Sequence, residues 1–408
     1  MAPERAGASA RLHPRGSSQG GLRQYNERVV LQAIRLHGAL PAAEIARLTH
    51  LTPQTVSQIS RRLLDDGLLA KGELVRGKVG QPSVPLALSP EGAYAIGIKI
   101  GRRSMDVLLV DFTGAVRARW STEYEFPEPE HVYGEIAQRV KSIRRKLGSA
   151  GQERLTGIGV AAPLSLGGWQ ALLGFPRNLS EQWERTDVGQ AIGRLTGLPV
   201  QSLKDTAAAC VAELVAGRGR HLRSFLYLFV DTFIGGGLVI DSTIRAGPHG
   251  NAGAVGSLPL GVVRNGKPDQ LLSVASILTL ERRFVAADLD GSAAGDERAL
   301  QAPWRAHTRR WIADAANAIA LAINCGACLL DLDAAIVDGS FSRDLLAELL
   351  ESLNTALGRY SWQGVHQPEV LAGTIGSDAQ ALGGAWIPLQ ANFAPDRDLF
   401  LKASPAVA

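Results

Sequence analysis

The segment GIKIGRRSMDVLLVDFTG (97–114) decides the fold, because its two apolar runs flank a glycine turn. This pattern predicts two strands joined at Gly101, and a glycine turn of this kind is typical of backbone that closely approaches a phosphate group. The turn, however, also contains Arg102 and Arg103, and Lys99 lies directly before it. The segment therefore predicts a phosphate-binding frame that is filled with cationic side chains.

Similar strand-and-turn patterns continue towards the C-terminus. A strand followed by a loop or helix is predicted at 155–166, 198–217, 224–260, 328–342 and 368–386. Strands and helices mixed in this order indicate an α/β body, and its length favours two lobes.

Composition and charge limit the classes of protein to which this chain could belong. Of the 408 residues, 46% are hydrophobic and three are cysteines, so we expect a cytoplasmic protein without structural disulfides and without a membrane partner. The first 90 residues contain 12 Lys and Arg against 6 Asp and Glu, whereas the remainder contains 31 against 33. A basic N-terminal region in front of a nearly neutral body indicates a polyanionic partner, although a solvated basic surface would look the same. Residues 1–22 and 391–408 are predicted to be tails, the first of them disordered.

The basic region contains a helix-turn-helix pattern. Apolar residues recur at helical spacing in 26–38, and 40–69 is predicted to form a helix, a short turn and a second helix. Thr52 is predicted to cap the second helix, with Pro53 in its first position, and Gly67 ends it.

The polar face of that second helix fits DNA. Glutamine can bond an adenine edge in two places, and arginine can reach guanine or a phosphate. The next segment, 68–90, predicts two short strands around a basic tip that could meet the DNA backbone. The alternative is a small helical bundle that docks another protein. The predicted DNA-binding residues are Gln54, Thr55, Ser57, Gln58, Arg61, Arg62, Arg76, Lys78 and Gln81.

The chain as a whole resembles the ROK family, which contains repressors and sugar kinases. The resemblance is carried by the order and spacing of TPQTVSQISRRLLDDGLL (52–69), GQPSVPLALSPEGAYAIGIKIG (80–101), FPRNLSEQW (175–183), KDTAAACVAE (204–213) and IGGGLVIDSTIRAGPHGNAGAVG (234–256). It implies a winged helix-turn-helix at 23–90 and a two-lobed body of the actin/hexokinase, or ribonuclease H-like, fold at 91–390. It also implies a homodimeric transcriptional regulator of the repressor branch.

Two departures from the family pattern affect the nucleotide site. Family kinases have an Asp and then Gly-Gly-Thr at the first phosphate turn, where this chain has Lys99, Arg102 and Arg103 beside Ser104. The second phosphate turn, Gly-Thr-Gly in the kinases, reads Asp-Thr-Phe at 231–233. Loss of the acid removes a magnesium contact, and arginines cannot restore it, although they could bind an anion themselves. We therefore expect no catalytic residues, no cofactor and no enzymatic activity.

The family's zinc and sugar sites are also changed. Ser257 replaces the zinc-binding histidine and no cysteine cluster follows it, so we expect no metal. We expect Cys325 and Cys328 to be buried core residues. The resemblance implies that the chain keeps two of the family's sugar-binding residues, Asn178 and Asp205. The Glu and His that the family has in the glycine loop are replaced here by Ala254 and Ser257.

The predicted ligand-binding residues are thus Asn178, Asp205 and Asn251. Ordinary roles remain open for them, since an aspartate at this place caps a helix and an asparagine is common in loops. Three functions remain open: a DNA-binding repressor that senses a sugar or sugar derivative, a sugar kinase with an added DNA-binding head, and a regulator that responds to a protein partner.

Overall fold

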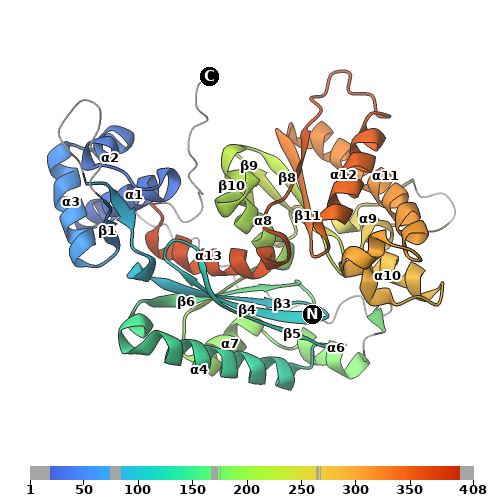
Figure 1. Cartoon of the computed structure of the whole chain (residues 1–408), viewed down its shortest axis with the longest axis horizontal. Coiled ribbons are helices and arrows are strands. Elements are labelled where there is room, and N and C mark those ends of the chain that lie inside the picture. The colour runs from blue at the N-terminus through green and yellow to red at the C-terminus, as the bar shows by residue number, and fades with distance from the viewer. Residues whose placement is uncertain are drawn as a thin grey trace, which may run out of the picture.

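The structure, a computed structural model, describes residues 19–73, 84–166, 173–174, 176–262, 266 and 268–395. It consists of an N-terminal helical head and two lobes, each built on a five-stranded sheet (Figure 1). The predicted fold class, a winged helix-turn-helix followed by a two-lobed α/β body, is confirmed.

The head is formed by three helices and a two-stranded sheet, namely α1 (Gln19–His37), α2 (Ala42–Thr49), α3 (Pro53–Asp65), β1 (Leu69–Lys71) and β2 (Leu86–Leu88). Val30, Ile45, Val56 and Ile59 are fully or almost fully buried between the helices, as the helical spacing of apolar residues requires. Strands β1 and β2 pair antiparallel, with Leu69 opposite Leu88. The predicted wing tip, with Arg76, Lys78 and Gln81, lies outside the described residues.

The first lobe contains a mixed sheet in the order β5-β4-β3-β6-β7. Its strands are β3 (Tyr94–Ile100), β4 (Ser104–Asp111), β5 (Val116–Glu123), β6 (Leu155–Ala162) and β7 (Val200–Lys204). The first three pair antiparallel, whereas β6 and β7 run parallel to β3. Helices α4 (Pro129–Glu153), α6 (Arg177–Glu184) and α7 (Val188–Thr196) lie on its outer side (Figure 1).

The second lobe repeats this plan in the order β10-β9-β8-β11-β12. Its strands are β8 (Phe225–Val230), β9 (Gly235–Ile240), β10 (Thr243–Arg245), β11 (Ala334–Gly339) and β12 (Glu369–Ala372). Strands β8, β9 and β10 pair antiparallel, and β11 runs parallel to both β8 and β12. The outer side is covered by α9 (Leu271–Ala275), α10 (Ile277–Val285), α11 (Arg305–Leu330) and α12 (Arg343–Leu357) (Figure 1).

Two helices, α8 (Asp205–Ala216) and α13 (Ala379–Phe393), lie between the sheets and join the lobes (Figure 1). Helix α13 approaches its neighbours so closely that a Cβ atom on Gly383 would lie 1.7 Å from the carbonyl oxygen of Ala208 in α8. A Cβ atom on Gly97 of β3 would likewise lie 1.9 Å from the carbonyl oxygen of Ala381. Glycine is therefore required where the backbones of these elements meet.

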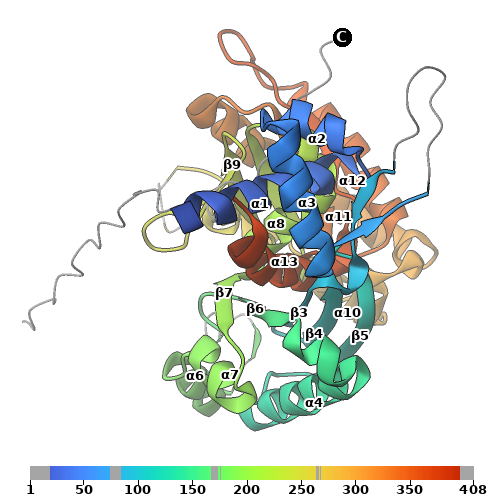
Figure 2. The ribbon, with the colours of Figure 1, turned by 90° about the vertical axis from the view of Figure 1, so that its left-hand side faces the viewer.

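The head packs directly on this joint. Buried residues of α1, such as Ile34, share one hydrophobic cluster with Phe112 of the first lobe and Trp386 of α13. Figure 2 shows α1 and α3 above α13, with the first lobe below. Arg154 of the first lobe donates to the carbonyl oxygen of Gly67 at 3.3 Å, where α3 has just ended. The head is thus attached to the body through packing as well as through the connecting chain.

The tails are shorter than expected, because α1 begins at Gln19 and α13 extends to Phe393. Ala394, the residue after α13, is only 3% exposed, so it is still buried against the body and does not belong to a tail. The other domain boundaries stay predictions.

Helix α11 corrects two further expectations. By length and composition it could cross a membrane, which we did not expect of any segment, but half of its apolar window is buried inside the protein, as in a core helix. Its last turn projects beyond the core, so Cys328 is exposed and Cys325 half-buried. The prediction that both are buried core cysteines is wrong, whereas Cys210 of α8 is buried.

Candidate functional site

Helix α3 presents a polar stripe to solvent. Thr52 caps the helix by accepting a hydrogen bond from the backbone N–H of Thr55 at 3.2 Å, and Pro53 occupies the first position, as predicted. The side that faces away from Val56 and Ile59 is exposed, and it lies on the outer side of the head (Figure 1). Four predicted DNA-binding residues fall on this stripe at helical spacing: Gln54, Ser57, Gln58 and Arg61.

Two predicted DNA contacts are partly used inside the head. The Thr55 hydroxyl lies 2.8 Å from that of Thr52, so it takes part in the cap. The Nε atom of Arg62 lies 3.4 Å from a carboxylate oxygen of Glu27 in α1, and this ion pair joins α3 to α1. Arg62 therefore has a structural role that its position in the sequence did not reveal.

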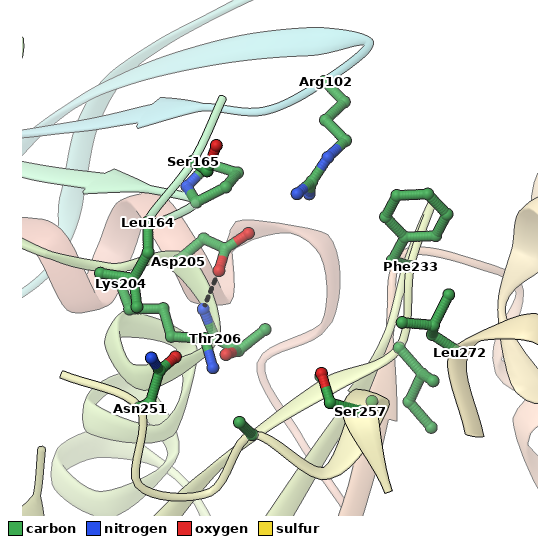
Figure 3. A pocket seen from close by; sticks show the side chains of 15 residues that line it. Arg102, Leu164, Ser165, Lys204, Asp205, Thr206, Phe233, Asn251, Ser257 and Leu272 are labelled. Atoms are coloured by element: carbon green, nitrogen blue, oxygen red, sulfur yellow. Dashed lines mark hydrogen bonds between the residues drawn. The ribbon is translucent and has the colours of Figure 1, made fainter. Parts of the chain in front are cut away.

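A cavity of about 220 Å³ opens between the lobes at the N-terminus of α8 (Figure 3). Two of the three predicted ligand-binding residues, Asp205 and Asn251, line it, and so does Ser257. Asn178 does not; it is exposed on α6, on the outer side of the first lobe. The structure gives Asn178 no place in this cavity. The lining also includes residues that we did not predict to bind a ligand: Arg102, Leu164, Ser165, Lys204, Thr206, Phe233 and Leu272.

Asp205 is the first residue of α8 and not its cap, which is Lys204. Its carboxylate accepts a hydrogen bond from the backbone N–H of Thr206 at 2.7 Å. Burial raises the pKa of Asp205, although Arg102 and the bond from Thr206 act in the opposite direction. A carboxylate held in this way at the cavity wall can accept hydrogen bonds from the hydroxyl groups of a ligand.

Arg102 extends from the turn between β3 and β4 into the mouth of the cavity (Figure 3). Its guanidinium carbon lies 4.9 Å from the centre of the Phe233 ring, which belongs to the second lobe. Burial lowers the pKa of Arg102, while Asp205 and Asp231 act to raise it. We predicted that Arg102 would crowd a nucleotide phosphate, and the structure places it against Phe233, above Asp205.

The Lys99 ammonium occupies the centre of the altered phosphate frame. It lies 3.4 Å from a carboxylate oxygen of Asp106 and 3.9 Å from one of Asp231, and it donates to the Ser104 hydroxyl at 3.1 Å. Burial acts to lower the pKa of Lys99, but the nearby carboxylates, first of all that of Asp231, outweigh it and raise the pKa. A side-chain cation thus neutralises carboxylates that would otherwise repel one another.

The turn between β3 and β4 is also closed by an ion pair, in which Arg103 bonds Glu281 of α10 across the two lobes. The adjoining cleft, of about 820 Å³, is lined by more acidic than basic side chains, among them Asp106, Glu123 and Asp231. Such a lining would repel the phosphates of ATP. The residues present therefore do not fit magnesium-bound ATP.

Comparisons with known proteins agree with this architecture. Residues 95–391 match the model of the ROK family, and residues 23–70 match that of a winged helix-turn-helix DNA-binding domain. The chain therefore belongs to the ROK family. Its winged helix-turn-helix in front of a ROK body makes it a transcriptional regulator of that family with a DNA-binding helix-turn-helix.

Two curated relatives are similar to this chain in sequence, and one solved structure is similar in fold. The chain is 28% identical to the transcriptional regulator Mb0495 of Mycobacterium bovis over 62% of its length, and 24% identical to the N-acetylglucosamine repressor of Escherichia coli O157:H7 over 61%. The matched segments span 58% and 63% of those two proteins. The crystal structure of a ROK family transcriptional regulator, a homologue of the E. coli MLC protein, superposes with a TM-score of 0.66 at 20% identity, covering 92% of this chain and 98% of that one.

Proposed function

We propose that this regulator is a repressor that binds a palindromic operator as a homodimer in the cytoplasm. The observation that carries the proposal is the exposed stripe of Gln54, Ser57, Gln58 and Arg61 on a well-capped helix. Glutamine and arginine at adjacent helical turns suit base edges and phosphates in a major groove. Two linked heads would match two half-sites of the operator.

We also propose that the cavity at the N-terminus of α8 binds a small effector of carbohydrate type. The support is the relative named for N-acetylglucosamine, together with Asp205 and Asn251, whose polar groups border the cavity. The apolar side chains of Leu164, Phe233 and Leu272 cover other parts of the same wall. Ala254 and Ser257 stand where the family has a glutamate and a histidine, so either the effector is less polar at that end than a simple hexose or it binds weakly.

The body lacks kinase activity in this proposal. Its support is the Lys99 ammonium among Asp106 and Asp231, and the Arg103–Glu281 pair that closes the phosphate turn. Isothermal titration calorimetry with Mg-ATP tests this part, and we expect no heat of binding. Micromolar binding would instead favour a sugar kinase with an added head.

The repressor proposal is tested by selecting operators from random duplexes, followed by titration with and without a panel of sugars and sugar derivatives. We expect a palindromic site, and a dimer at micromolar concentration in analytical ultracentrifugation. A monomer that binds a single half-site tightly would contradict the proposal.

For the effector, Asp205→Ala is expected to leave operator binding nearly intact and to abolish the response to an active sugar. Asn178→Ala is the matched control, because Asn178 lies on α6 and is not among the described residues that line the cavity. A folded Asp205→Ala protein with the full response would remove Asp205 from the site. If no sugar alters operator binding, the effector proposal fails while the DNA-binding proposal stands.

A further inference from the structure

A second cavity, of about 150 Å³, lies where the head meets both lobes. Its wall combines Gln32 and Arg35 of α1, Arg220 beyond the end of α8, and Trp386 and Gln390 of α13. It is separate from the cavity at Asp205, since the two share no lining residue. Any ligand here would touch the head and the body at once.

Arg35 is the central cation of this cavity. Its guanidinium carbon lies 4.9 Å from the centre of the Phe112 ring and 4.9 Å from that of the Trp386 ring, so it is held between one residue of the first lobe and one of α13. Burial lowers the pKa of Arg35 to about 10, with Asp111 acting to raise it. The side chain therefore keeps its charge at neutral pH.

Two donors at this cavity are unsatisfied. The Nη1 atom of Arg35 and the indole Nε1 atom of Trp386 are both buried and have no hydrogen-bond partner in the part of the chain that the structure describes. Trp386 is only 6% exposed. Buried hydrogen-bond donors in native proteins are nearly always paired. Two unpaired donors beside one cavity therefore indicate that an acceptor binds in it.

The charge of the wall identifies the kind of acceptor. Arg220 adds a second cation, and its guanidinium donates to the carbonyl oxygen of Leu36 at 3.1 Å, which fixes it beside α1. Among the described residues that line the cavity none is acidic. Two arginines and an indole N–H without a carboxylate suit an oxyanion. Since a cavity of this volume can hold a ligand the size of benzene, a phosphate ion fits it.

We propose that this cavity is a binding site for a phosphate-sized oxyanion, either the free ion or the terminal phosphoryl group of a small metabolite. Arg35 and Trp386 supply the unsatisfied donors and Arg220 the second charge. Since these residues belong to the head, to α13 and to the second lobe, a bound oxyanion fastens the head to the body. The site would make the orientation of the DNA-binding helix depend on an anion in addition to the effector.

The direct test is isothermal titration calorimetry of the full chain with inorganic phosphate at constant ionic strength. We expect saturable binding of one phosphate per chain, and sulfate, which has the same shape, is expected to compete. A second titration with glycerol phosphate distinguishes the free phosphate ion from a phosphorylated metabolite as the natural ligand. Tighter binding than phosphate assigns the site to a phosphorylated metabolite, and binding of phosphate alone assigns it to the free ion. If neither binds beyond the level of a chloride control, water fills the cavity and the proposal is wrong.

Variants locate the site. Arg35→Gln is expected to weaken phosphate binding by about tenfold or more, because it removes a charged donor. Trp386→Phe removes the other orphan donor and keeps an aromatic ring against Arg35, which guards against a variant that fails to fold. Arg223→Gln is the matched control, since that arginine pairs with Asp241 at the surface and lies outside the cavity. Equal phosphate affinity in the control and both cavity variants would overturn the assignment.

A third measurement tests the consequence for the head. Bound phosphate is expected to slow hydrogen exchange of the amides of α1 by several fold, while those of α4, on the far side of the first lobe, stay unchanged. Arg35→Gln is expected to remove this protection. Phosphate that binds without protecting α1 would contradict the proposed link between head and body.

Discussion

The exposed side of α3 and the turn between β3 and β4 both carry basic residues, but they use them in opposite ways. Gln58 and Arg61 face solvent on α3. At the turn, Arg103 and the preceding strand residue Lys99 are bonded to carboxylates of the protein itself. The comparison teaches that basic residues indicate an anionic partner only where they are not already paired. It also explains how the strand-and-turn frame tolerates its buried carboxylates, since the cation that neutralises them is the Lys99 side chain.

The largest effect is expected at Lys99. Replacing it by methionine keeps the volume and leaves the carboxylates of Asp106 and Asp231 without their cation. Because breaking a buried ion pair leaves an uncompensated charge, we expect the free energy of unfolding to fall by about 3–5 kcal/mol. Urea denaturation measures the change.

The control is Arg223→Gln, which breaks an exposed pair with Asp241 and should cost less than about 1 kcal/mol. If Lys99→Met cost no more than this control, the ammonium would not be what holds the frame together.

The next effect concerns base readout by α3. Gln58→Ala is expected to reduce discrimination at one base position of the operator by about 1–3 kcal/mol, because a bidentate contact to a base is lost. Titration of duplexes altered at single positions measures it. Gln138→Ala, which changes an exposed glutamine of α4, is the control. Equal weakening of specific and random DNA by Gln58→Ala would show that the stripe on α3 does not read bases.

A smaller effect separates the neighbouring arginines of α3. Arg62 pairs with Glu27, whereas Arg61 is exposed. Arg62→Ala is therefore expected to lower the free energy of unfolding by up to about 1 kcal/mol. Arg61→Ala is expected to leave it unchanged. Thermal unfolding of the two variants is the measurement, and the reverse order would contradict the assignment of Arg62 to the head's own structure.

The smallest effect is a pH dependence at Asp205. Burial raises its pKa, so the folded protein binds this proton more tightly than the unfolded chain. Ionising Asp205 therefore lowers the free energy of unfolding. This loss is absent below the pKa that Asp205 has in the unfolded chain, grows as the pH rises, and is complete above its pKa in the folded protein. Asp205→Asn removes it, so the variant should gain stability over the wild type as the pH rises from 3 to 7. A gain that shrinks over this range would contradict the raised pKa.

Much of this architecture could be predicted from local patterns. Helical spacing and capping residues located α3, and apolar runs ending at Gly101 located β3 and β4. The family resemblance predicted that Asp205 binds a ligand. The structure shows that it lines a cavity, and its ligand role stays a prediction.

What could not be predicted depends on contacts between distant segments. Glu281 lies 178 residues from Arg103, and no local pattern pairs them. Arg62 and Glu27 face each other only because α1 packs on α3. Asn178 was assigned from its motif, but the structure places it on α6 and not among the described residues that line the cavity. Exposure of Cys328 depends on where α11 leaves the core, which apolar composition does not reveal.

The most direct test of the contrast between the two regions is the salt dependence of operator binding in Arg61→Gln and Arg103→Gln. Each variant loses one positive charge, so the overall charge change is matched. If Arg61 contacts a phosphate, the slope of log affinity against log salt should become shallower by about 1, because one counterion fewer is released. Arg103→Gln should keep the wild-type slope, since its charge is already bonded to Glu281. An equal change in both variants, or a change in Arg103→Gln alone, would contradict the account.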